Sequence, residues 1–282
     1  FSPYVENLVF DGDVNFKSYF ESVQCHGDYD TWLELAKKVR SGNVFPRLIL
    51  AASFASVLVK PLGGLPFFLH IWGGTEVGKT VGLMLAASVW ANPEVGRYIH
   101  TFNSTSVGRE KSAAFVNSLP LILDELQIIK DKKDFDQSIY MLSEGAGRTR
   151  GNKSGGVDKT PTWSNCVITS GEMPITNASS GGGAVNRILE VECTERLFDD
   201  PRHVANTLKS NYGFAGKAFV ELLQVPEMIE AAQIIYEQIY AQTKTEDTME
   251  KQAGAAALVL TADKLVTDWI FKDDKALTVK EI

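Results

Sequence analysis

The chain of 282 residues has only three cysteines, Cys25, Cys166 and Cys193, and no pair with C-x-x-C spacing. An odd number without that spacing argues against a disulfide framework and against a zinc site. We therefore expect a reducing compartment in which the cysteines serve as small core residues.

The sequence also lacks any apolar stretch as long as a membrane span, so no membrane partner is expected. It begins Phe1-Ser2-Pro3-Tyr4, which has neither a methionine nor the charged and apolar pattern of a signal peptide. We expect a cytoplasmic fragment of a longer protein.

A general excess of basic residues is absent as well. The 28 basic and 35 acidic residues give a net charge of −7, so any contact with nucleic acid must be local. With 44% hydrophobic residues, the chain can bury a full core, and its length favours a main domain with an appendage.

One segment carries a clear chemical signature. It follows the apolar run 67–72, opens a helical pattern, and reads G-x-x-x-x-G-K-[ST]. Such a loop wraps phosphates with backbone N–H groups, while its lysine contacts the β- and γ-phosphates and its hydroxyl residue ligates Mg²⁺. The alternative is a simple glycine turn between core elements. The predicted nucleotide-binding residues are Gly73, Gly74, Thr75, Glu76, Val77, Gly78, Lys79 and Thr80.

Paired acids close a second apolar run, 119–123, which is typical of a buried parallel strand. Ligands of open α/β sheets lie at the carboxyl ends of the strands. We expect Asp124 to hold Mg²⁺ together with Thr80, and Glu125 to orient and deprotonate the attacking water. Alone, the two acids would equally suit a helix N-cap.

Apolar runs alternate with amphipathic stretches through the middle of the chain, which predicts a parallel sheet with helices on both faces. The expected strands lie near 67–72, 98–102, 119–124, 165–169 and 187–192, and the expected helices near 79–91, 106–118 and 134–143.

Helical spacing dominates both ends of the chain. A helical pair is expected at 29–40 and 45–59, and helices at 202–208, 214–223, 226–240 and 249–271. The predicted fold is α/β, an AAA+ P-loop NTPase core (65–195) with a central parallel sheet, an N-terminal lead-in and helical cap (1–64) and a C-terminal all-helical lid subdomain (196–282). The chain lacks the Asn-Lys-x-Asp motif of GTPases, which favours ATP.

Two further kinds of residue are expected around the triphosphate. A polar residue at the tip of the strand near 165–169, either Thr169 or Ser170, would sense the γ-phosphate, although ordinary turn residues also occur there. An arginine from a neighbouring subunit would stabilise the transition state. Arg187, after a glycine-rich segment, is the first candidate, and Arg148 and Arg150 are its competitors.

The segment 148–163 is locally basic, with four basic residues against the single acid Asp158. Its Gly155-Gly156 pair between polar arms can form a β-hairpin that grips a phosphate backbone. A solvated surface loop is the alternative. The predicted DNA contacts are Arg150, Lys153 and Lys159, whereas Trp163, beside them, is not expected to stack on a base.

Several stretches resemble one family, the domain of unknown function nine-two-seven of phage and mobile-element primase-helicase proteins, which is similar to the cassette-chromosome Cch helicases. The matching stretches are 70–73 leading into the lysine loop, 86–90, 101–105, 119–125, 140–142, 169–172 and 258–271. The resemblance implies an AAA+ motor akin to the MCM replicative helicases, a homo-oligomeric hexameric ring with DNA, single-stranded, in its pore, and an upstream primase-like region that this chain lacks.

These features together predict a magnesium-dependent ATPase that acts as a DNA helicase or translocase in mobile-element or phage replication. Two alternatives stay open. One is an AAA+ loader or remodelling factor that acts on protein, and the other is a scaffold that nucleotide merely holds together.

Overall fold

The computed structural model describes residues 9–126, 132–151, 155–176, 186–244 and 250–282. Within them, five strands form one sheet in the order β2-β3-β4-β1-β5, and every pairing is parallel. The strands are β1 (Phe67–Trp72), β2 (His100–Thr101), β3 (Leu121–Asp124), β4 (Cys166–Gly171) and β5 (Ile188–Glu192). The predicted α/β fold with a central parallel sheet is confirmed.

The strands form where the sequence offers short apolar runs, because a sheet covered on both faces buries every position of its central strands. β3 and β4 are buried throughout. β2 is shorter than the predicted strand 98–102. Gly96 N donates to Ile99 O, so the chain still forms a turn at Ile99. The Tyr98 hydroxyl donates to Pro120 O, just before β3, at 2.8 Å.

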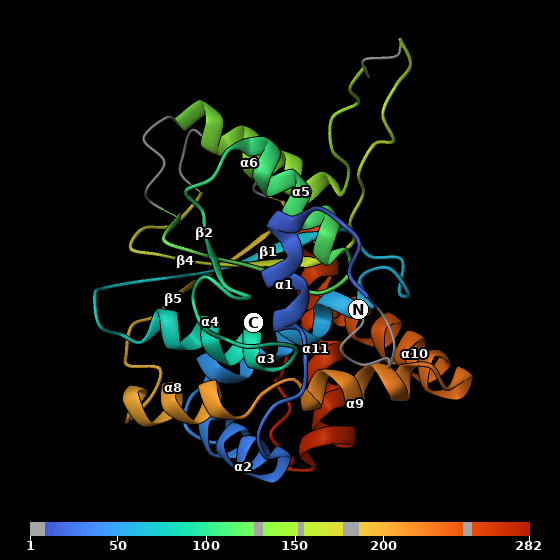
Figure 1. Cartoon of the computed structure of the whole chain (residues 1–282). Coiled ribbons are helices and arrows are strands. Elements are labelled where there is room, and N and C mark those ends of the chain that lie inside the picture. The colour runs from blue at the N-terminus through green and yellow to red at the C-terminus, as the bar shows by residue number, and fades with distance from the viewer. Residues whose placement is uncertain (1–8, 127–131, 152–154, 177–185, 245–249) are drawn as a thin grey trace.

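Helices cover both faces of the sheet, as Figure 1 shows. On one face lie α5 (Ser106–Val116) and α6 (Lys132–Glu144), with α5 packed on β3. On the other lie α3 (Val44–Ala55) and α4 (Lys79–Ser88), both packed on β4. The remaining helices are η2 (Val14–Phe16), α1 (Lys17–Ser22), α2 (Tyr29–Arg40), η3 (Ser56–Leu58), α8 (Pro201–Ser210), α9 (Phe214–Leu223), α10 (Pro226–Thr243), α11 (Glu250–Val266) and the π-helix η5 (Thr267–Phe271).

Several helices begin where the sequence places a capping side chain. Asp28 accepts from Thr31 N at the start of α2, Thr105 accepts from Gly108 N at the start of α5, and Asp200 caps α8 ahead of Pro201. After Cys193, each element that the structure describes is helical, as predicted. Because α11 packs against α3, the N-terminal pair and the C-terminal helices share one layer.

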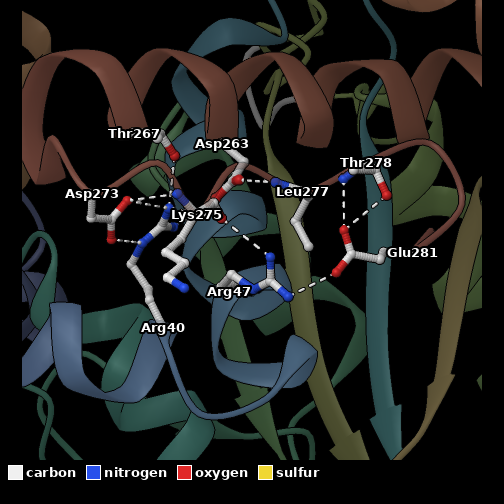
Figure 2. Close-up of polar contacts among 9 residues, drawn as sticks. All are labelled: Arg40, Arg47, Asp263, Thr267, Asp273, Lys275, Leu277, Thr278 and Glu281. Atoms are coloured by element: carbon white, nitrogen blue, oxygen red, sulfur yellow. Dashed lines mark hydrogen bonds and ion pairs between the residues drawn. The ribbon is translucent and has the colours of Figure 1, made fainter.

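Buried charges tie the end of the chain to this layer (Figure 2). Arg40 is fully buried and donates to Asp263 at 2.7 Å, to Thr267 Oγ1 at 2.7 Å and to Asp273 at 3.1 Å. Arg47 binds Glu281 at 2.8 Å. These bonds hold the segment 272–282 against α2 and α3. Among the described helices, none is long and apolar enough to cross a membrane.

Candidate functional site

The glycine loop 73–80 joins the carboxyl end of β1 to the first turn of α4. It needs glycine at two points. Gly73 has φ 149° and a Cβ there would lie 2.7 Å from Cys193 O, while Gly78 adopts the left-handed region at φ 98° just before the helix. Glu76 also has a positive φ, 68°. The predicted strand, loop and helix are therefore confirmed, and the backbone follows a path that few other residues permit.

Lys79 is the first residue of α4, and its side chain folds back over the loop. Its Nζ donates to Gly73 O at 2.8 Å and to Gly74 O at 2.6 Å. The ammonium group therefore lies against the loop itself, where a phosphate held by the loop would meet it.

The acid at the end of β3 meets the loop. Asp124 is 7% exposed, and its Oδ2 accepts from Thr80 Oγ1 at 3.1 Å. Its Oδ1 accepts from Ser170 Oγ on the neighbouring strand β4. Two hydroxyls and one carboxylate thus gather at the carboxyl edge of the sheet. They are hard oxygen donors of the kind that Mg²⁺ takes in small number alongside phosphate and water, so the residues fit this ion. Larger groups of three or more His, Cys, Asp or Glu able to hold a metal are absent from the described residues.

Glu125 follows in a strained conformation. Its φ is 59°, in the left-handed region that side chains other than glycine rarely adopt. Its N–H donates to Asp124 Oδ1 at 3.0 Å and to Ser170 Oγ at 3.4 Å, and its side chain is exposed. Such strain clusters at functional sites, where the surroundings enforce it. Here it turns Glu125 out of the sheet, beside the carboxylate of Asp124.

The two sensor candidates face opposite ways, because successive side chains of a strand alternate. Ser170 binds Asp124, whereas Thr169 Oγ1 lies 2.9 Å from His70 Nδ1. His70 Nε2 must donate to Met173 O, 2.9 Å away, so Nδ1 accepts from Thr169. Burial lowers the pKa of His70, which favours this neutral form. The structure therefore brings Ser170, and not Thr169, to the acid pair.

Arg187 lies directly before β5, with its side chain turned inward. It is 7% exposed, and its Nη1 donates to Ser143 O at 2.8 Å and to Glu144 Oε1 at 2.6 Å. This placement differs from the expectation that the side chain projects across a subunit boundary. A salt bridge within the chain, at the end of α6, is the physical reason.

A hairpin precedes β4, as the sequence predicts. Antiparallel bridges join Ala146 to Thr162 and Gly151 to Val157, and in Figure 1 the segment stands clear of the body at the upper right. Lys159 and Arg148 are exposed on it, while Lys153 lies outside the described residues. DNA contact by these side chains stays a prediction.

Arg150, the other predicted DNA contact, is held at the root of the hairpin. Its guanidinium binds both carboxylate oxygens of Glu110 on α5, at 2.6 and 2.8 Å. The Glu110 side chain is 3% exposed, and the hydrogen bond from Arg150 lowers its pKa. A side chain at Gly147 would crowd this pair, because a Cβ there would lie 2.2 Å from Glu110 Oε1. Trp163 is buried at 2% exposure, and its Nε1 donates to Leu142 O.

Sequence reasoning missed one part of the site. A cavity of about 400 Å³ lies between the turn after α2 and the segment 195–204. Leu197 N donates to Val77 O at 2.9 Å, and the Phe198 ring lies 3.4 Å from a Cβ placed on Gly78, so the cavity adjoins the glycine loop. Residues 195–200 of this segment lie between the predicted strand 187–192 and the predicted helix 202–208, where no periodicity marks them.

The sheet order, the glycine loop after β1 and the acid at the end of β3, one strand beyond the neighbour β4, place the chain among P-loop nucleotide-binding folds. Residues 9–163 match the family described as "Domain of unknown function (DUF927)", and the chain belongs to this family. The predicted family relationship is confirmed.

Two solved structures are similar to the chain. One is titled "SCCmec type IV Cch - active helicase", with a TM-score of 0.72 and 18% sequence identity over 93% of this chain and 50% of that one. The chain thus spans about half the length of that helicase. The other, "The A form apo structure of NrS-1 C terminal region-CTR", has a TM-score of 0.36 and 12% identity over 96% of this chain and 72% of that one. No curated protein matches the chain.

Proposed function

We propose that the chain is a magnesium-dependent ATPase. Lys79 contacts the β- and γ-phosphates cradled by residues 73–80, and Thr80 and Asp124 hold Mg²⁺. When bound, this ion neutralises charge on the phosphate oxygens. Glu125 orients and deprotonates the attacking water. Ser170, rather than Thr169, fixes the carboxylate of Asp124 and the backbone of Glu125 from β4. The observation that carries the proposal is the contact of Thr80 with Asp124, which joins the two motifs.

The nucleotide base is assigned to the cavity beside the loop. Phosphates held by residues 73–80 leave the base within reach of Leu197 and Phe198, which adjoin Val77 and Gly78. The cavity combines these apolar side chains with Asn43 and His203, a mixture suited to a flat heteroaromatic ring with polar edges. We assign ATP because the base-reading motif of GTPases is missing from the sequence.

We propose that the subunits form a homo-oligomeric ring, a hexamer, in which each nucleotide site is completed by a residue of the neighbouring subunit. Arg187 lies at the amino end of β5, whereas the glycine loop lies at the carboxyl ends of the strands. A strand of five residues separates these edges by about 17 Å. Arg187 is therefore too far to serve its own subunit's triphosphate, and we propose that it serves the site of a neighbour.

We propose that ATP hydrolysis drives translocation along DNA during mobile-element or phage replication in the cytoplasm. The hairpin 146–162 carries exposed Arg148 and Lys159, and the sequence places Lys153 between them. Such point charges bind a phosphate backbone of any sequence, so single-stranded DNA in the pore is the proposed substrate. The fold shared with a structure titled an active helicase supports this proposal.

Steady-state ATPase measurements on the purified chain, with and without single-stranded DNA, test the proposal. We expect turnover that needs Mg²⁺, is stimulated by DNA, and is abolished in Glu125→Gln, with Glu227→Gln on the exposed surface of α10 as the matched control. Loss of stimulation in Lys153→Ala/Lys159→Ala supports DNA as the substrate.

The remaining outcomes decide between the alternatives. A rate indifferent to DNA favours a factor that remodels protein, and bound ATP without turnover favours a nucleotide-dependent scaffold. A wild-type chain that binds no nucleotide contradicts all three.

A further inference from the structure

The last turn of α6 contacts both the hairpin and Arg187. Leu142 O accepts from Nε1 of Trp163, which ends the hairpin, at 2.8 Å. One residue later, Ser143 O accepts from Arg187 at 2.8 Å, and Glu144 Oε1 binds the same guanidinium nitrogen at 2.6 Å. The turn is therefore a shared support for two segments that are distant in sequence.

The root of the hairpin is packed tightly onto this turn. Gly145 has φ 76°, and a Cβ there would lie 2.8 Å from Trp163 O and 2.9 Å from Pro66 Cγ. Trp163 N also donates to Gly145 O at 2.9 Å. Because close-packed groups transmit strain, we expect a force on the hairpin to act on the end of α6.

Among the described residues, the Ser143 carbonyl and the Glu144 carboxylate accept the hydrogen bonds that hold Arg187 inward. Its Nε is buried without a hydrogen-bond partner among the described residues. A buried, unsatisfied donor opposes this position. The Glu144 side chain is 40% exposed, so solvent screens the ion pair that opposes release. The Glu144 carboxylate is the charged acceptor at this position, beside the neutral carbonyl of Ser143.

We propose that Glu144 is a positioning residue that holds Arg187 inward, and that displacement of the hairpin by DNA draws Glu144 away and frees Arg187 to reach the neighbouring subunit. Glu144 is thus an inhibitory contact within the chain, and its release makes hydrolysis dependent on DNA. The inference rests on the proposed function, because it requires Arg187 to act on a neighbour's ATP and the hairpin to bind DNA.

The test compares Glu144→Gln with wild type and with Glu227→Gln in steady-state ATPase assays with and without single-stranded DNA. Glutamine keeps the shape of the side chain but removes the charge. We expect the rate without DNA to rise at least about threefold, as expected for loss of one partly exposed ion pair in a two-state equilibrium. The ratio of the rates with and without DNA then falls toward one.

Two further variants separate positioning from a merely structural role. Glu144→Asp keeps the carboxylate and restores most of the dependence on DNA. The double variant Glu144→Gln/Arg187→Ala is as inactive as Arg187→Ala, because the higher ATPase rate of Glu144→Gln requires Arg187. Melting temperatures that match the control exclude a folding defect.

A Glu144→Gln protein with the wild-type rate and the wild-type stimulation by DNA overturns this inference alone. So does a rate that falls in Glu144→Gln, since Glu144 would then support Arg187 in its active position. Failure of the wild-type protein to hydrolyse ATP overturns the proposed function, and this inference with it.

Discussion

Thr80 and Asp124 lie 44 residues apart and meet through a 3.1 Å hydrogen bond between Thr80 Oγ1 and Asp124 Oδ2. Thr80 comes from the first turn of α4 and Asp124 from the end of β3. These elements converge because parallel strands present their carboxyl ends at one edge of the sheet. The contact joins two separate sequence motifs in one site.

Ser170 and Thr169 give a matched pair for testing which hydroxyl supports the site. We expect Ser170→Ala to lower Mg²⁺-dependent ATPase activity about 10- to 100-fold, as for other groups that orient a metal ligand. Thr169→Val should have a much smaller effect, because that side chain binds His70 on the other face. Titration of the ATPase rate with Mg²⁺ checks both. Equal losses in the two variants would contradict the assignment.

Gly73 and Gly74 test the backbone of the loop. A Cβ on Gly73 meets Cys193 O at 2.7 Å and sits at φ 149°, whereas one on Gly74 meets no atom within 4 Å. We expect Gly73→Ala to lower the free energy of unfolding by about 1–3 kcal/mol and to weaken ATP binding. Gly74→Ala should keep wild-type stability. Denaturant unfolding and fluorescent nucleotide titration measure the two effects, and a stable Gly73→Ala variant would refute the argument.

Arg150 is predicted to stabilise the root of the hairpin. Removing it in Arg150→Ala leaves the buried Glu110 carboxylate without its partner, which should reduce the free energy of unfolding by about 1–3 kcal/mol. Lys159→Ala, exposed on the opposite arm of the hairpin, is the control. Because Arg150 lowers the pKa of Glu110, this stabilisation is complete above the usual carboxyl pKa of 4.5 and is lost as pH falls below it. Hydrogen exchange of the hairpin amides against pH provides a local measurement.

Mild acid should destabilise the protein through the buried His70 and the partly buried His100. Burial lowers the pKa of His70 and His100 below the usual 6.5, so the folded state binds these protons less readily than the unfolded chain. Stability is therefore full above pH 6.5 and falls below it, by at most about 1.4 kcal/mol per pH unit for each histidine. Melting temperatures between pH 7.5 and 5.5 check this. His70→Gln should flatten the dependence, and His203→Gln, exposed on α8, should leave it unchanged.

Arg40 and Arg47 should differ widely in their effect on stability, although both bind the C-terminal segment. Arg40→Ala leaves Asp263 fully buried without its ion-pair partner, which should lower the free energy of unfolding by about 3–5 kcal/mol. Arg47→Ala breaks a partly exposed pair with Glu281 and should lower it by less than about 1 kcal/mol. Urea unfolding distinguishes the two, and similar losses would contradict the difference in burial.

Much of the fold could be predicted from local pattern. The helices at 29–40 and 214–223 and the strand at 67–72 have the predicted bounds, because periodicity and capping residues mark them within a few positions. The end of the helix after the loop was predicted less well. The predicted helix 79–91 ends at Ser88, and the chain then makes the turns that bring Trp90 into the core.

The sequence by itself determined the chemistry that this chain can offer. Each motif is a run of consecutive residues, so it can be recognised from the sequence alone. These motifs are the glycine loop with Lys79 and Thr80, the acids 124–125 after an apolar run, and the basic segment before β4.

Only the tertiary structure decided how those groups are partnered. Strand alternation and register turned Ser170 toward Asp124 and Thr169 toward His70. Packing of the helices formed the salt bridges of Arg150 with Glu110 and of Arg187 with Glu144. The physical reason is that an ion pair or hydrogen bond forms between the groups that the packed elements bring within about 3 Å. The number of residues between two groups in the sequence does not indicate that distance.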